Sequence, residues 1–131
     1  MKSLVLLGVV LISLTAGGGN AGKTANAEVV LDRSSFYTEA EMQEAVHVVK
    51  ETFRSFQGCE MQKIVYAPEK SQMEAAYEGV EPENAIVFVT EFDVGFGADA
   101  CWDEGEHVTD WSFVLTRENA DSPWVVVNWG Y

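Results

Sequence analysis

Basic residues are scarce in this sequence, which has eight Lys and Arg residues against 21 Asp and Glu residues. The formal net charge of the chain is −13. A surface of this sign repels the phosphates of nucleic acids and the headgroups of anionic lipids, so we expect neither class as a partner. It attracts cationic peptides or metal ions, although an acidic surface also serves simply to keep an exported domain in solution.

Cysteine is also scarce, with Cys59 and Cys101 as the only two in the sequence. A bridge between them would close roughly 43 residues and stabilise the fold by about 4 kcal/mol in the chain-entropy model. We name this pair as a disulfide candidate. The alternative is two separate thiols, one of them packed as a small hydrophobic side chain. The sequence places no histidine beside either residue, so a catalytic cysteine is not expected.

Acidic residues are absent from the first 27 positions. Lys2 opens this segment, an apolar run follows at residues 4–14, and an A-x-A pattern ends it at residues 25–27. These three features are typical of a secretory signal peptide, so we expect residues 1–27 to be removed on export. Cleavage at the end of this segment is the first choice, and a site nearer Ala21 is the second.

The sequence lacks an apolar run long enough to cross a membrane. Residues 4–14 cover about half of the ~20 residues that a spanning helix needs. Gly17 stands where a bacterial lipoprotein processing site has its lipid-bearing cysteine. We therefore expect no stable membrane anchor and a secreted, released protein.

Local patterns predict two helices and four strands in the remaining chain. Thr38 and Glu41 form a capping box, and apolar residues at helical spacing over 42–56 predict an amphipathic helix that Gly58 ends. Alternating apolar and polar residues predict strands. The predicted strands span residues 59–67, 85–94, 109–117 and 124–129.

A second capping box, from Ser71 to Glu74, predicts a short helix that Gly79 closes. The element order is then helix, strand, short helix and three consecutive strands.

The expected organisation is a leader at residues 28–37 and a single domain at 38–131. Successive strands joined by short loops usually pair as antiparallel neighbours. A long amphipathic helix laid on such a sheet buries one face of each. The expected fold class is therefore α+β, with a long N-terminal helix packed on a curved antiparallel sheet of about four strands.

Six segments carry a family resemblance. They are Phe36-Tyr37-Thr38-Glu39-Ala40-Glu41, Phe56-Gln57-Gly58-Cys59-Glu60-Met61, Ile64-Val65-Tyr66, Glu69-Lys70-Ser71, Asp110-Trp111 and the ending Trp124-Val125-Val126-Val127-Asn128-Trp129-Gly130-Tyr131. They resemble small exported domains of Gram-positive gut bacteria, most of them predicted lipoproteins of unknown function. The resemblance implies an extracytoplasmic location and a layout similar to the cystatin-like cone of nuclear-transport-factor-2-like proteins. It brings no catalytic residues. The chain departs from the group by having Gly17 in place of the lipid-bearing cysteine and more acid in the loop at 98–107.

Aromatic residues are expected to gather beneath the first helix. If the strands at 85–94 and 109–117 turn their bulky side chains inward, the rings that converge under the helix are those of Phe88, Phe92, Trp111 and Phe113. Trp129 and Tyr131 lie at the end of the last strand, where they either plug or line the opening. A cone that is open at its wide end would make this space a ligand pocket, whereas dense core packing is the alternative. The candidate ligand-binding residues are Phe92, Trp111, Trp129 and Tyr131.

The loop at 95–107 concentrates carboxylates and one imidazole. Calcium takes six to eight oxygen ligands and transition metals combine histidine with carboxylate, so a metal site is one reading and a solvated acidic loop is the other. The candidate metal ligands are Asp99, Asp103, Glu106 and His107. Histidine beside a carboxylate also suits a general base, but this pairing is common on surfaces. No cofactor is expected.

The opposite face of the predicted sheet is rich in valine. It carries Val87, Val89, Val114, Val125 and Val127. This is more apolar surface than a soluble monomer usually exposes. We therefore expect the face to be covered by a second copy of the chain, in a homodimer, or by residues 28–37.

Together these patterns favour a secreted, non-enzymatic module that binds a small ligand or a partner protein. The alternative is an extracytoplasmic hydrolase or isomerase that uses the interior pocket. Such an enzyme needs a buried acid–base pair, which the predicted inward positions do not offer. A third possibility is an interaction module whose acidic surface meets cationic partners, and such a complex would weaken sharply with salt.

Overall fold

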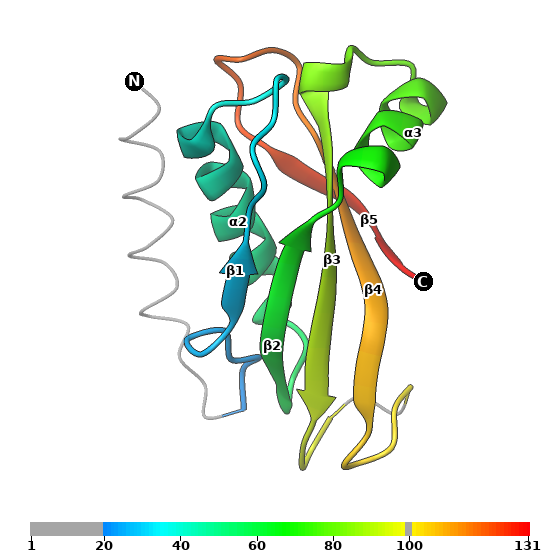
Figure 1. Cartoon of the computed structure of the whole chain (residues 1–131). Helices are drawn as coiled ribbons and strands as arrows, with labels where there is room; N and C mark the ends of the chain where they lie inside the picture. Colours follow the sequence, from blue (N-terminus) through cyan, green and yellow to red (C-terminus); the bar gives the residue numbers. More distant parts are fainter. Residues whose placement is uncertain (1–19, 99–100) are drawn as a thin grey trace.

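The computed structural model describes residues 20–98 and 101–131 (Figure 1). In chain order the elements are β1 (Glu28–Val30), α2 (Glu39–Phe53), β2 (Cys59–Tyr66), α3 (Pro68–Glu78), the 3-10 helix η1 (Pro82–Asn84), β3 (Ala85–Val94), β4 (His107–Thr116) and β5 (Val125–Gly130). The strands form one sheet in the order β1-β2-β3-β4-β5. β1 is parallel to β2, and all other neighbours are antiparallel.

The expected fold class is wrong in its helix and in its sheet. No long N-terminal helix occurs among the described residues, because α2 has 15 residues and follows β1, and α3 has 11. The sheet has five strands and is mixed, because residues 28–30 of the expected leader pair in parallel with 63–65. A three-residue strand is too short to show alternation, and its partner lies far along the chain, so no local pattern reveals it. The cone layout implied by the resemblance is not confirmed.

The start of α2 agrees with the predicted capping box. The Glu41 N–H donates to the Thr38 hydroxyl at 3.1 Å, and the Thr38 N–H donates to the Glu41 carboxylate at 2.8 Å. The helix ends at Phe53, a few residues before Gly58, whose φ of +76° places it in the left-handed region. The buried stripe of α2 consists of Met42, Ala45, Val46, Val49 and Phe53.

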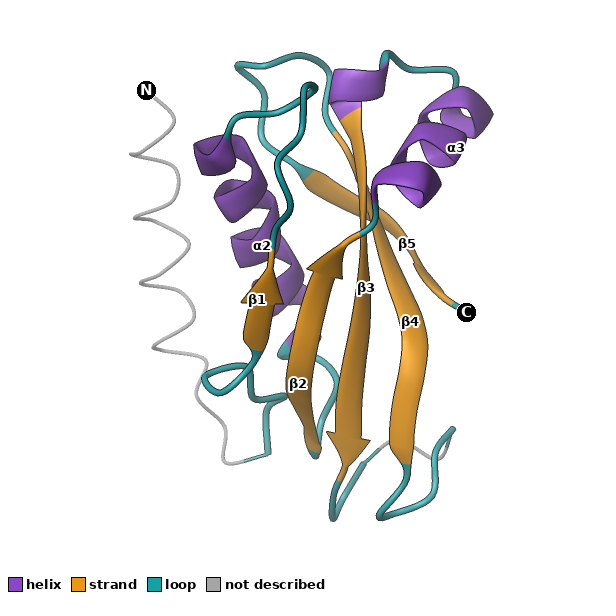
Figure 2. Cartoon of the chain, viewed as in Figure 1, coloured by secondary structure: helices purple, strands orange, loops and turns teal. Residues whose placement is uncertain are grey.

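Helix α3 begins earlier than the sequence predicts. Pro68 occupies the first turn, so Ser71 lies inside the helix and does not cap it. Its hydroxyl donates to the Ala67 carbonyl at 2.7 Å and accepts the Val87 N–H at 2.8 Å. Ser71 therefore fastens α3 to β3 on the face of the sheet opposite α2 (Figure 2). Gly79 closes the helix in the left-handed conformation, as predicted.

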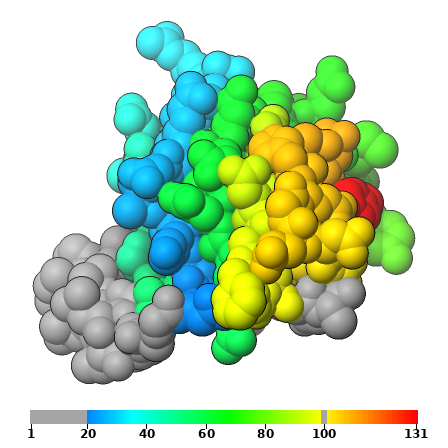
Figure 3. All heavy atoms as spheres, turned by 90° about the horizontal axis from the view of Figure 1, so that it is seen from below, coloured from blue at the N-terminus to red at the C-terminus, as the bar shows by residue number. Residues whose placement is uncertain are grey.

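The segment before β1 also packs on the domain. The Gly58 N–H donates to the Asn20 carbonyl at 2.9 Å, and the Gly22 N–H donates to the Arg54 carbonyl at 3.0 Å. A side chain at Gly22 would place its first carbon 2.0 Å from the Phe53 carbonyl oxygen, so this close approach requires glycine. Seen from below in Figure 3, this blue segment lies against the green residues of β2. There the backbones of Lys23 and Glu60 form an isolated parallel β-bridge.

The core lies between α2 and the inner face of the sheet. The prediction of a strand over 85–94 is confirmed, and its even positions Ile86, Phe88 and Phe92 are fully buried. Phe113 and Leu115 of β4 face the same way and are equally buried. The alternation that the sequence predicts for these two strands therefore sets the inner face correctly.

Candidate functional site

An aromatic cluster fills the space where α2 ends. Phe56, in the turn after α2, lies at its centre, with ring centroids 5.5 Å from Trp129, 5.8 Å from Trp102 and 6.1 Å from Trp111. The cluster consists of Phe53, Phe56, Phe92, Trp102, Trp111, Phe113, Trp129 and Tyr131. Its rings come from the end of α2, from three strands and from the loop before β4, so the fold assembles it from segments far apart in sequence.

All four residues predicted to bind a ligand belong to this cluster. Trp111 lies 6.0 Å from Phe92 and 5.1 Å from Tyr131, and Trp129 joins them through Phe56. Phe92 is fully buried and serves the core, whereas Trp129 and Tyr131 are 47% and 80% exposed. The exposed rings at the end of β5 are therefore the part of the predicted set that a partner can reach.

Sequence reasoning missed Phe56 and Trp102 as members of the cluster. Phe56 was assigned to the buried stripe of the helix, and Trp102 stands in a loop without periodicity. The only signal for Trp102 was its type, since a tryptophan in an acidic loop is a residue with a large apolar surface to bury.

Trp111 brings an unsatisfied donor to the cluster. Its indole Nε1 is buried and has no hydrogen-bond acceptor among the described residues. Its backbone carbonyl accepts the Thr90 hydroxyl at 2.8 Å, which holds β4 against β3 at this point. A buried N–H group without an acceptor is costly, so a ligand that supplies an acceptor at this point would gain from it.

Strand β5 leaves one side of its backbone open. It pairs with β4 on one side, and no other strand of the described chain lies beyond it. The stretch from Val125 to Tyr131 contains no charged residue. Val125 is 53% exposed and Val127 is 46% exposed. Edge strands are usually protected by charge, proline, short length or a β-bulge. β5 has no charged residue and no proline within its span, and its one irregularity is the register shift against β4 at Val127.

A cleft of about 230 Å³ adjoins this edge, between α3 and the outer face of β4 and β5. Met73 of α3 lines the cleft and is 71% exposed, and Tyr77 of the same helix is 84% exposed. The lining residues on α3 are Lys70, Met73 and Glu74, and those of the sheet include Ser112, Asn128 and Tyr131. Exposed apolar groups therefore gather along β5 and α3.

Helix α3 covers part of the valine face. Val87 and Val114 are 1% and 6% exposed, because α3 packs on this side of β3. They lie inside the fold, not on an outward surface as the alternation suggested, since nothing in the strand pattern shows where a later helix docks. Val89 is partly buried, which leaves Val125 and Val127 as the exposed valines of the predicted set.

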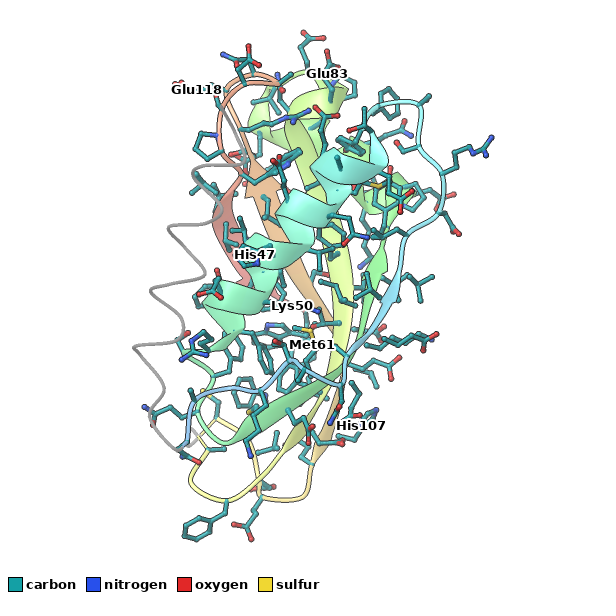
Figure 4. The ribbon with its side chains drawn as sticks, turned by 90° about the vertical axis from the view of Figure 1, so that its left-hand side faces the viewer. His47, Lys50, Met61, Glu83, His107 and Glu118 are labelled. Atoms are coloured by element: carbon teal, nitrogen blue, oxygen red, sulfur yellow. The ribbon has the colours of Figure 1, made fainter. Side chains whose placement is uncertain are left out.

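His107 turns away from the loop that was expected to bind a metal ion. Its Nδ1 lies 2.6 Å from the Asp93 carboxylate and its Nε2 lies 3.3 Å from the Glu91 carboxylate, both on the outer face of β3. The hydrogen bond to Asp93, and then that to Glu91, raises the pKa of His107 above its usual value. Figure 4 shows this residue at the lower end of the sheet, away from α2.

The remaining predicted metal ligands are only partly described. The Glu106 carboxylate accepts the Asp103 N–H at 3.1 Å, and Asp99 lies outside the described residues. Within residues 20–98 and 101–131, no group of three or more His, Cys, Asp or Glu side chains is arranged to hold a metal ion. The metal site stays a prediction, and so does the disulfide, whose Cys59 is buried and whose Cys101 is exposed.

A buried ion pair holds the opposite end of the molecule, where Glu83 and Glu118 are labelled in Figure 4. The Arg117 guanidinium pairs with the Glu41 carboxylate at 3.0 Å and lies 4.3 Å from the centre of the Trp124 ring. It also donates two hydrogen bonds to the Glu83 carbonyl. These contacts tie the start of α2 and the 3-10 helix η1 to the end of β4, so we assign Arg117 a structural role.

Fold and site together define a small domain with two short helices, a five-stranded mixed sheet, an aromatic cluster and one open sheet edge. The chain belongs to the family described as domain of unknown function DUF4829, which matches residues 24–130. Neither the curated proteins nor the solved structures contain a match to it. Within the described part of the chain, no helix combines the length and apolar character needed to span a membrane.

Proposed function

We propose that this domain is a secreted, non-enzymatic binding module that recognises another protein along β5. The observation that carries the proposal is the open edge of β5, whose neutral stretch Val125–Tyr131 leaves apolar side chains exposed. An extended segment that adds to such an edge gains main-chain hydrogen bonds, and alternate side chains give it specificity. Trp129 and Tyr131 supply the large aromatic anchors that dominate binding energy at protein interfaces.

Secretion is proposed from the first 27 residues, whose basic, apolar and small-residue sections match an export signal. The enzyme alternative is not proposed. His107 with Asp93 and Glu91 is a histidine–carboxylate set, but its side chains are about half exposed and project from the outer face of the sheet. Water competes for every contact there, and the aromatic cluster lies on the other face.

Site-specific photo-crosslinking in the producing cells tests the binding edge. The photoreactive residue p-benzoylphenylalanine replaces Val127, which is 46% exposed, in one variant and Phe96, a more accessible apolar residue of the β3–β4 loop that is 85% exposed, in the control. We expect a discrete crosslinked product from position 127, outside the cytoplasm, and none from position 96. Equal labelling at both positions, or none at 127, would contradict the proposal.

The aromatic cluster supports a second candidate function, the binding of a small apolar ligand that carries a hydrogen-bond acceptor. The observation in its favour is the buried Trp111 Nε1 without an acceptor in the described part of the chain. A fluorescence titration with the neutral probe N-phenyl-1-naphthylamine should saturate and should weaken in a Trp111→Ala variant. A linear response that the variant leaves unchanged would rule this candidate out.

A further inference from the structure

The partner that best fits the edge of β5 is another copy of the same edge. We propose that two copies of this chain bind edge to edge through β5, in an antiparallel pair that makes their sheets continuous. This inference rests on the proposed function, because it names the occupant of the binding edge. Three features of the described residues carry it: the charge distribution, the side chains of β5 and the difference between the two sheet edges.

Charge favours a second copy over a cationic partner. Each copy has a formal net charge of −13, so two copies repel one another over most of their surface. The stretch Val125–Tyr131 is the part of the sheet edge without a charged side chain, so two acidic copies can approach there at the least electrostatic cost. A cationic peptide would find no carboxylate side chain within that stretch, and so would gain little from it.

The side chains of β5 suit pairing with a second copy, around the residue Val127 at which the register against β4 shifts. In an antiparallel pair centred on Val127, the Val125 of one copy lies opposite the Trp129 of the other. A β-branched residue opposite an aromatic one is a favourable cross-strand pair. The Trp129 N–H is held by the Asn128 side chain at 2.9 Å, so Val125 and Trp129 meet through their side chains and the main-chain hydrogen bonds of the pair lie between these two residues.

The other edge of the sheet offers no comparable surface. β1 has three residues and begins at Glu28, an exposed carboxylate. Short length and charge are the features that protect sheet edges from pairing. The contrast between the two edges therefore directs association to β5, and it closes the assembly at two copies because a twofold pair uses both β5 edges.

The oligomeric state of the purified secreted chain tests the proposal. Analytical ultracentrifugation across the micromolar range should show a dimer for the wild type. Val127→Lys should raise the dissociation constant at least tenfold, because two lysines then face one another across the twofold axis. The control Phe96→Lys makes the same charge change at an exposed apolar residue of the β3–β4 loop, and should leave the constant unchanged.

Two measurements on the wild type need no variant. The dimer should tighten as sodium chloride is raised, because salt screens the repulsion between like-charged copies. Hydrogen exchange of the β5 amides should slow as protein concentration rises. The inference is overturned if the wild type stays monomeric throughout. It is also overturned if Val127→Lys leaves a dimer intact and the hydrogen exchange of the β5 amides does not change with protein concentration.

The oligomeric state and the crosslinking at position 127 together distinguish failure of this inference from failure of the proposed function. A monomeric chain whose position 127 crosslinks to a different protein overturns self-association and leaves the binding edge in place. A monomeric chain with no crosslink at 127 overturns both.

Discussion

Glu41 connects three separate parts of the fold. Its carboxylate accepts the Thr38 N–H at the start of α2 and pairs with Arg117 at the end of β4. Its carbonyl accepts the Trp124 indole N–H at 3.1 Å, just before β5. The sequence identifies only the first of these contacts, because a capping box is local. The pairing with Arg117 depends on how the helix lies on the sheet.

Removing the charge of Glu41 should therefore destabilise the whole domain. The Glu41→Gln variant can keep the capping contact but leaves Arg117, whose side chain is 2% exposed, without its counter-ion. Loss of one partner of a buried ion pair costs about 3–5 kcal/mol. Urea unfolding should show a loss of that order. The control Glu39→Gln removes an exposed charge from the same first turn, and an equal loss there would contradict the buried-pair explanation.

His107 should make stability depend on pH. Its pKa is raised in the folded state by the hydrogen bonds to Asp93 and Glu91, so the charged imidazole is favoured by folding. The resulting stabilisation is fully present below the unfolded pKa of about 6.5 and is lost as pH rises through the higher folded pKa. The free energy of unfolding of the wild type, relative to His107→Gln, should therefore fall as pH rises above about 6.5.

Unfolding curves of the two proteins across this range provide the measurement. The control is Asp93→Asn, which removes the carboxylate nearer to the imidazole and should weaken the pH dependence while leaving the histidine in place. A difference between wild type and His107→Gln that stays constant with pH would show that the ion pairs are too well solvated to matter.

At the scale of the elements, local sequence patterns predicted several helices and strands correctly, whereas features that depend on pairing with distant segments were not predicted. The strand over 85–94, the capping box of α2 and the glycine end of α3 were all predicted, because alternation, capping residues and left-handed glycines act over a few residues. The strand β1 and the position of α3 on the sheet were not predicted. Each depends on a partner far along the chain, through the ladder at 63–65 and the contact of Ser71 with Val87.

The candidate site follows the same division. Alternation placed Phe92 and Trp111 on the inner face, and the structure brings both into one aromatic cluster. The sequence did not predict that Phe56 and Trp102 belong to the cluster. They lie in a turn and a loop, which carry no periodicity from which the direction of a side chain could be predicted. The open edge of β5 is a property of strand order, which local pattern does not determine.

The segment at 20–27 should contribute measurably to stability. The Lys23 N–H donates to the Cys59 carbonyl at 3.0 Å and its carbonyl accepts the Met61 N–H at 2.8 Å, and further bonds hold Asn20 and Gly22. At about 1 kcal/mol for each net hydrogen bond, a chain that starts at Glu28 should unfold about 2–4 kcal/mol more easily than one that starts at Asn20. Thermal unfolding of the two truncated chains measures the difference.

This prediction bears on export, because cleavage after Ala27 would remove the segment. The intact mass of the released protein identifies its first residue. Equal stability of the two truncated chains would show that the contacts of residues 20–27 do not stabilise the fold. Cleavage after Ala27 would then cost the domain no stability.

At the scale of the whole molecule, the net charge of −13 opposes compactness. Like charges on one surface repel, and the repulsion is screened once the Debye length falls to about 10 Å near 0.1 M salt. We predict that the unfolding free energy of the monomeric Val127→Lys variant rises with sodium chloride. Using this variant separates folding from association, which the same salt change also affects.

Charge reversal on the surface provides the control for that prediction. Glu69, Glu78 and Glu118 are exposed. In the Val127→Lys chain, whose formal charge is −13 plus one, or −12, their triple replacement by Lys raises the charge by six, to −6. The triple variant should be more stable than its parent at low salt and should respond less steeply to added salt. If both chains respond equally, the salt effect arises from stronger apolar burial and not from screened repulsion. In that case the acidic surface would act on solubility and choice of partner, and not on folding.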